Sequence, residues 1–265
     1  MPRAPDSHKG ENGKAAVIGG SRCQHGAPLF SALALESSGI DLIWVLLPDA
    51  HENVAKQASL NFQVIPLEGD SIEQKHVDII LSTLATMNSA VIGPGIAREE
   101  KNLKALQHII AGAACPLVLD ATALQPETLN NVNGKCVVLT PHLGECERMG
   151  LTKKDLRCAA KTSGAVILLK GQDDTVVHPD GTIKVMSGGN AGLTVGGTGD
   201  ALAGLIAGLI AQKIPPFDAA ILASRTIKKA GELLYKQKGY AYTTRDVIEQ
   251  IPTLLFAKRP LSRDA

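Results

Sequence analysis

The chain has 265 residues, of which 45% are hydrophobic and 20% are charged, so it can bury a sizeable core and is not an intrinsically disordered protein. Its formal net charge is only +1, and its aromatic content is 3%. Nucleic-acid binding requires clustered lysine and arginine together with stacking rings, so this composition argues against a nucleic-acid partner.

Cysteine usage and the N-terminal segment indicate the compartment in which the protein works. The cysteines number five, an odd count, and none of them forms a CxxC motif. Neither a disulfide framework nor a zinc ribbon is expected, and we expect no metal held by protein ligands alone. The first residues, MPRAPDSHKGENG, are polar and contain no signal-peptide core. These features predict a cytoplasmic protein without membrane association.

The strands that we expect along the first two thirds of the chain are continuously apolar. Apolar runs that predict strands lie at 14–20, 41–48, 61–67, 89–95, 116–121, 135–142 and 165–171. Stretches with helical patterns lie between them at 27–39, 71–87 and 99–112. Strands without polar alternation are typical of a sheet covered on both faces, and their alternation with helices indicates βαβ units in a parallel sheet.

The segment 174–189, DTVVHPDGTIKVMSGG, has a different pattern. Two extended runs flank a turn that contains Asp180 and Gly181, which is a good signal for an antiparallel hairpin. A glycine-rich loop and a helical C-terminal third follow, and no linker or repeat divides the chain. We therefore predict one domain over 1–265, a three-layer α/β/α fold whose mostly parallel sheet carries an antiparallel hairpin near one edge.

The stretch 188–212, GGNAGLTVGGTGDALAGLIAGLIAQ, places one carboxylate, Asp200, between a glycine loop and an apolar run. Gly197 and Gly199 permit unusual backbone angles and close approach of a ligand, and the first amides of a helix attract anions, so the loop is suited to phosphate. Three plainer interpretations exist. In the first, Asp200 is simply the N-cap of the helix. In the second, the apolar run is a membrane segment, although its length of about 12 residues falls short of the roughly 20 that a span needs. In the third, Gly204 and Gly208 only allow a core helix to pack closely.

Other residues that are suited to binding a ligand or taking part in a reaction follow the predicted strands. They are Gly19–Ser21, Gly93–Gly95, Asp120, Thr140–His142 and Lys170–Gly171. In open α/β sheets ligands bind beyond the carboxyl ends of the strands, so we expect these residues to meet at one sheet edge. The sequence contains no Walker loop, and no GxGxxG motif follows the first predicted strand. The nucleotide-binding loop is therefore expected near the C-terminus, and it matches neither of these two motifs.

The order of these motifs carries a family resemblance. The stretches concerned are DSHKGENG (6–13), VIGGS (17–21), GAP (26–28), IGPG (92–95), LDATAL (119–124), LTPHLGE (139–145), LLKG (168–171) and GNAGLTVGGTGDALAG (189–204). The chain resembles the ribokinase-like superfamily and, within it, the ADP- or ATP-dependent NAD(P)H-hydrate dehydratases. It departs from the family pattern at Thr122, where aspartate is commoner, at Ala191, where proline is common, and at Gln172–Asp174, which is three residues rather than two before Thr175.

The resemblance implies a repair reaction on damaged dinucleotides. NADH or NADPH that has gained water on its nicotinamide ring would be dehydrated at the expense of ADP or ATP, through phosphorylation of the ring hydroxyl and loss of phosphate. Asp200 would be the general base, and the amides of Gly197, Thr198 and Gly199 would hold the migrating phosphoryl group. A carboxylate beside bound phosphate is repelled by it, which should raise the pKa of Asp200.

The resemblance also assigns binding residues and partners. Ala27, Gly95 and His142 would line the hydrate site together with Asp200. The nucleotide phosphates would contact Lys170, Gly171, Thr175 and Gly199, and Mg²⁺ is expected because it bridges phosphoryl oxygens. A separate NAD(P)H-hydrate epimerase would work with this chain, because no fused epimerase domain is expected. Relatives often form homotetramers, and the small-residue helix at 27–39 suggests packing against a copy of itself.

Two other functions share these features. A kinase for a small alcohol, such as a sugar or a vitamin, would use the same loop and the same Asp200. A nucleotide-binding protein without catalytic activity would fit the departures at Thr122 and Gln172–Asp174, but the intact GTGD at 197–200 argues against it. The sequence leaves open the choice between ADP and ATP and between NADH hydrate and NADPH hydrate.

Overall fold

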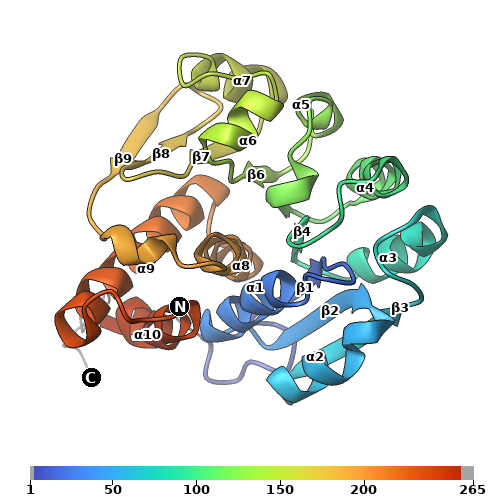
Figure 1. Ribbon diagram of the computed structural model, residues 1–265, viewed down its shortest axis with the longest axis horizontal. Coiled ribbons are helices and arrows are strands. Elements are labelled where there is room, and N and C mark those ends of the chain that lie inside the picture. The colour runs from blue at the N-terminus through green and yellow to red at the C-terminus, as the bar shows by residue number, and fades with distance from the viewer. Residues whose placement is uncertain (1–2, 258–265) are drawn as a thin grey trace.

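The computed structural model describes residues 3–257 and contains a nine-stranded sheet with helices on both faces (Figure 1). The strands are β1 (Lys14–Ile18), β2 (Leu42–Pro48), β3 (Phe62–Leu67), β4 (Ser89–Ile92), β5 (Leu117–Leu119), β6 (Val137–Leu139), β7 (Val166–Leu169), β8 (Asp174–Val177) and β9 (Ile183–Met186). Their order across the sheet is β3-β2-β1-β4-β5-β6-β7-β8-β9. Neighbours from β3 to β7 are parallel, and β8 is antiparallel to both β7 and β9. The predicted parallel sheet with a hairpin at one edge is confirmed.

Two groups of helices enclose the sheet. One face is covered by α1 (Gly26–Ser37), α2 (Glu52–Ala58), α8 (Thr198–Ala211), α9 (Pro216–Lys238) and α10 (Thr244–Ala257). The other face is covered by α3 (Val77–Leu84), α4 (Glu100–Gly112), α5 (Thr128–Asn131), α6 (Leu143–Arg148) and α7 (Leu156–Ser163). Within residues 3–257, no helix combines the length and apolarity needed to cross a membrane.

Side chains along the strands point alternately into these two cores. In β1, Ala15 and Val17 belong to the core beneath α1 and α8, whereas Ala16 and Ile18 belong to the core beneath α3 and α4. All four residues are fully buried. Because each strand must be apolar on both faces, its sequence reads as an uninterrupted apolar run. This explains why the expected strands matched the observed ones in order.

Several element boundaries differ from those expected from the sequence. The strand predicted over 89–95 ends at Ile92, because Gly93 and Gly95 adopt positive φ angles of 121° and 70° and turn the chain. The helix predicted over 71–87 is shorter, with a 3₁₀ turn (η2, Gln74–His76) before α3. The α-helix begins only after His76, whose ring accepts a hydrogen bond from the Glu73 amide and thereby caps the 3₁₀ turn. The short helices α2, α5, α6 and α7 were not predicted.

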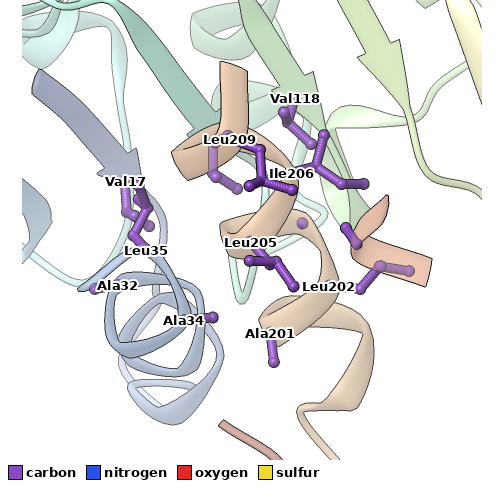
Figure 2. Packing of buried hydrophobic residues seen from close by; sticks show 14 of the residues in the cluster. Val17, Ala32, Ala34, Leu35, Val118, Ala201, Leu202, Leu205, Ile206 and Leu209 are labelled. Carbon is purple, nitrogen blue, oxygen red and sulfur yellow. The ribbon is translucent and has the colours of Figure 1, made fainter. Parts of the chain in front are cut away.

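Helix α8 packs directly against α1 (Figure 2). Two glycines of α8 allow this close approach. A Cβ atom on Gly204 would overlap the Ser31 carbonyl group, and one on Gly208 would overlap the Ser38 hydroxyl. The Ser31 hydroxyl also donates to the Asp200 carbonyl oxygen at 2.9 Å. The close-packing interpretation of these glycines is therefore correct. Within this chain α1 contacts α8 and α10, and the expected packing of helix 27–39 against a second copy stays a prediction.

Candidate active site

The loops that follow the parallel strands meet at one edge of the sheet. The Gly20 amide, after β1, donates to the Pro94 carbonyl, after β4, at 2.8 Å. The Lys170 amide, after β7, donates to the Pro141 carbonyl, after β6, also at 2.8 Å. These bonds join loops that are far apart in the sequence, so the polar residues expected at the strand ends are brought together.

A cleft of about 390 Å³ opens beside these loops. Residues of the loop before α1, of α1 itself, of the two strand-end turns and of the glycine loop line it: Gln24, Gly26, Ala27, Phe30, Gly95, Ala121, Gly196, Gly197 and Asp200. Four of the residues that sequence reasoning assigned to the reaction or to the hydrate therefore share one cleft. Gln24, Phe30 and Ala121 were missed. Gln24 and Phe30 lie only beside a motif, and Ala121 lies inside the stretch 119–124 without a side chain that indicates chemistry.

The glycine loop delivers Asp200 to this cleft from the first turn of α8. The helix begins at Thr198 with Gly197 as its N-cap, so Asp200 is not the N-cap and that plainer interpretation is wrong. Gly197 has φ = 98°, and a Cβ atom on it would overlap the Phe30 ring. Only glycine satisfies both the backbone angle and the contact. The Thr198 amide donates to the Val195 carbonyl at 3.3 Å. The N-terminal end of α8, with the Gly197 and Gly199 amides beside it, makes the cleft suitable for an anion.

Asp200 has the most clearly perturbed carboxyl group in the site. Burial, reinforced by the Asp120 carboxylate and opposed by the Lys170 ammonium, raises the pKa of Asp200 to about 7. A carboxyl group with a pKa near 7 is both available as a base at neutral pH and strong enough to take a proton from a hydroxyl. The expected rise in pKa is present without any phosphate, so its main cause here is desolvation.

A buried cluster of charges lies beneath the first turn of α8. The Lys170 ammonium donates to Asp120 Oδ1 at 2.7 Å and lies 3.6 Å from Glu145 Oε2. Thr140 Oγ1 also donates to Asp120 Oδ1, at 2.9 Å. Burial lowers the pKa of Lys170, but the carboxylates of Asp120, Glu145 and Asp200 outweigh that effect and raise it. Lys170 therefore remains charged, and sequence reasoning had given neither Asp120 nor Glu145 a role.

The nucleotide residues expected from the sequence fall in two neighbouring places. A Cβ atom on Gly199 would lie 3.4 Å from Lys170 Nζ, so these two residues are adjacent. Gly171 follows directly and donates its amide to Asp174 Oδ1 at 2.9 Å. Thr175 lies one residue further, inside β8, where it pairs with Leu169. The extra residue before Thr175 is thus accommodated in the turn 171–174, in which the Asp174 carboxylate accepts the hydrogen bond from the Gly171 amide.

His142 lies beside the cleft rather than among its lining residues. It is the N-cap of α6, where its Nδ1 accepts from the Glu145 amide at 3.2 Å and Glu145 Oε2 accepts from the His142 amide at 2.8 Å. Because Nδ1 is an acceptor in this network, the proton is assigned to Nε2. The side chain is 58% exposed, so this N–H can donate to a ligand at the rim.

One wall of the cleft is a braced turn, η3 (Ala121–Ala123), directly after β5. Ala121 has φ = 52°, an uncommon conformation for a residue with a side chain. The Arg148 guanidinium holds this turn by donating to the Ala121 carbonyl at 2.7 Å and to the Leu124 carbonyl at 2.8 Å. Thr122 Oγ1 donates to the Ile96 carbonyl at 2.7 Å. Thr122, at which the chain departs from the family pattern, therefore lies in the turn that forms this wall of the cleft.

Comparison with known proteins agrees with this geometry. The fold is that of the ribokinase-like superfamily: a ribokinase-like protein from Enterococcus faecalis superposes with a TM-score of 0.86 at 25% identity, over 97% of this chain and 91% of that one. The family model described as NAD(P)H-hydrate dehydratase matches residues 15–253. The chain belongs to the NAD(P)H-hydrate dehydratase family, and the resemblance inferred from its motifs is confirmed.

Individual relatives give the same result. An ADP-dependent (S)-NAD(P)H-hydrate dehydratase from Nitrosopumilus maritimus is 36% identical over 96% of this chain and 92% of its own length. A bifunctional NAD(P)H-hydrate repair enzyme from Pyrobaculum aerophilum is also 36% identical, but this chain spans only 52% of its length. The structure of an ADP/ATP-dependent NAD(P)H-hydrate dehydratase from Bacillus subtilis, co-crystallized with ATP/Mg²⁺, matches with a TM-score of 0.82 at 26% identity, over 97% of this chain and 93% of that one.

Proposed function

We propose that the protein dehydrates NADH hydrate and NADPH hydrate to NADH and NADPH in a reaction that consumes ADP or ATP. The observation that carries this proposal is the cleft in which Asp200, with its raised pKa, lies beside the N-terminal end of α8. Membership of the dehydratase family supports the choice of substrate. A hydroxyl must be activated and a phosphoryl group held, and this cleft offers one group for each task.

In the proposed reaction, Asp200 removes the proton from the hydroxyl on carbon six of the nicotinamide ring. The hydroxyl oxygen attacks the terminal phosphorus of the nucleotide, and the bond from that phosphorus to the departing nucleotide oxygen breaks. The amides of Gly197, Thr198 and Gly199 stabilise the charge on the migrating group, where one such donor is worth about 10²–10³-fold in rate. The ring nitrogen lone pair then expels phosphate from carbon six, and loss of a proton from carbon five completes the dihydronicotinamide.

The nucleotide is proposed to lie against Lys170, Gly171, Thr175 and Gly199, with Ala27, Gly95 and His142 contacting the hydrate. No cluster of three or more potential metal ligands exists within residues 3–257. Mg²⁺ is therefore expected to arrive on the phosphate oxygens of the nucleotide, as part of the co-substrate. The buried Lys170 ammonium supplies a fixed positive charge close to the same phosphates.

Replacement of Asp200 by alanine tests the assignment of the base. We expect turnover of NADH hydrate to be abolished while ADP and ATP still bind, because the proposed nucleotide contacts are made by other residues. Asp218→Ala is the matched control, since Asp218 is an exposed carboxylate in the first turn of the neighbouring α9. Full turnover by Asp200→Ala would show that another group removes the proton.

We further propose that the protein acts in the cytoplasm as a homotetramer, with a separate NAD(P)H-hydrate epimerase supplying the hydrate that it consumes. The link to an epimerase is supported by the bifunctional repair enzymes, of which this chain spans about half the length. Light scattering at micromolar concentration tests the assembly, and a monomer would rule it out. Adding a purified epimerase to a mixture of hydrate epimers should increase the fraction that is repaired.

A further inference from the structure

One face of α9 contacts two loops. One is the turn 170–174, which the nucleotide is proposed to touch, and the other is the loop that begins at Gly188 and leads to α8. The residues of this face are Ser224, Lys228, Gly231 and Glu232, which are spaced by about one helical turn. The first two reach the turn 170–174 after β7, and the last three reach the loop that begins at Gly188. No function has been assigned above to any of the four residues.

Lys228 is the centre of this face. It is only 6% exposed, and its Nζ donates to the Gln172 carbonyl at 2.7 Å and to the Gly171 carbonyl at 3.4 Å. Its ionic partner is Asp174, whose Oδ1 lies 3.7 Å from Nζ. A lysine that is withdrawn from water in this way is rare unless its ammonium is paired and hydrogen-bonded, and here it is both.

Asp174 connects the same turn to the helix. Its Oδ1 accepts from the Gly171 amide at 2.9 Å, and its Oδ2 accepts from the Ser224 hydroxyl at 2.7 Å. Both partners are held by one buried carboxylate, which is 7% exposed. Asp174 thus links the Gly171 amide of this turn to α9 through Ser224. Lys228 links the Gly171 and Gln172 carbonyl groups of the same turn to α9.

The second loop rests on the next turn of α9. A Cβ atom on Gly189 would lie 3.4 Å from Lys228 Cγ, so the stem of the same lysine lies against this loop. The Gly189 amide donates to Glu232 Oε1 at 3.3 Å. The Asn190 side-chain amide donates to the Gly231 carbonyl at 2.7 Å. One helix face thus sets the spacing between the two loops.

A buried ion pair contributes little to folding compared with apolar side chains of similar volume. We propose that Lys228, together with Asp174, is a positioning residue that fixes the turn 170–174 relative to the loop 188–193, which leads to Gly199, at the separation required by the nucleotide phosphates. This inference rests on the proposed function in one respect, namely that the nucleotide contacts Lys170, Gly171 and Gly199. It adds a role for α9, which touches no part of the hydrate cleft.

Replacement of Lys228 by methionine tests this role by direct binding rather than by activity. Calorimetric titration with ADP and with ATP, each with Mg²⁺, should show affinity weakened about tenfold or more, because small displacements of positioning groups have large effects. Binding of NADH hydrate should be unchanged. Arg225→Met is the matched control, since Arg225 lies on the same helix and is exposed. It should leave both affinities unchanged.

Two measurements separate positioning from general stability. Hydrogen exchange of Lys228→Met should show faster exchange confined to the turn 170–174 and the loop 188–193, whereas a structural role alone would affect the whole sheet. Asp174→Asn keeps an oxygen for the Gly171 amide but removes the negative charge, so it should weaken nucleotide binding less than Lys228→Met. It also serves as the test variant if Lys228→Met does not fold.

The inference is overturned if folded Lys228→Met and Asp174→Asn bind both nucleotides within about twofold of the parent protein, or if exchange increases throughout the sheet. It is also overturned if the parent protein binds neither nucleotide. If the parent protein binds nucleotide but does not repair NADH hydrate, the proposed function fails while the binding comparison still decides the role of Lys228.

Discussion

Replacing Asp200 by asparagine should stabilise the nucleotide-free protein above about pH 7 and have no such effect below about pH 4. Burial, reinforced by the Asp120 carboxylate, raises the pKa of Asp200 in the folded chain from 3.8 to about 7. Below about pH 4 the group is protonated in both states and contributes no difference. As the pH rises, the unfolded chain releases the proton first, so the free energy of unfolding falls until the folded pKa is passed.

The size of this effect follows from the two pKa values. One pKa unit corresponds to about 1.4 kcal/mol, so a rise from 3.8 to about 7 lowers the free energy of unfolding by about 4 kcal/mol at alkaline pH. Asparagine has nearly the same shape but does not titrate, so the variant avoids this loss. The difference between the variant and the parent protein should therefore grow through the interval between the two pKa values and then level off.

Urea unfolding of both proteins across this pH range measures the difference directly. Asp218→Asn is the control for the loss of one exposed carboxylate, because Asp218 is exposed on α9. A difference between Asp200→Asn and the parent that is the same at every pH would refute the reasoning. The same pKa predicts that kcat/KM of the parent enzyme rises with pH through about 7, since the base must lose its proton.

Two further substitutions probe the packing of α8 and the wall of the cleft. Gly204→Ala should lower the free energy of unfolding by about 3 kcal/mol or more, because the new methyl group overlaps the Ser31 carbonyl, whereas Gly196→Ala has open space and should be near neutral in urea unfolding. Arg148→Lys keeps the charge but not the forked geometry that holds the Ala121 carbonyl. Steady-state kinetics should show KM for the hydrate raised severalfold and KM for the nucleotide unchanged; an equal rise in both would contradict this role.

Much of the fold could be predicted because the parallel strands are buried on both faces and so read as uninterrupted apolar runs. The hairpin of β8 and β9 was equally visible in the pair Asp180–Gly181. The helices α2, α5, α6 and α7 were not predicted, because they have between four and eight residues, which is too short for a helical pattern to stand out. Boundaries at strand ends were also misplaced, since Gly93 turns the chain for a tertiary reason, its contact with the turn after β5.

The candidate site was predicted where its signal is local and missed where it depends on distant pairing. Gly197 and Asp200 stand out within one loop, and both line the cleft. The burial that raises the pKa of Asp200 and the contact of Lys170 with Asp120 arise only when the strands come together. Lys228 gave no signal, because its hydrogen-bond partner Gln172 lies 56 positions earlier in the chain.

The most direct test of the account is to incubate the purified protein with NADH hydrate, Mg²⁺ and either ADP or ATP, and to follow the return of dihydronicotinamide absorbance. The account predicts recovery that requires a nucleotide, and the preferred donor will be the one that gives the faster recovery. Folded protein that binds nucleotide and yet restores no absorbance with either donor would contradict it.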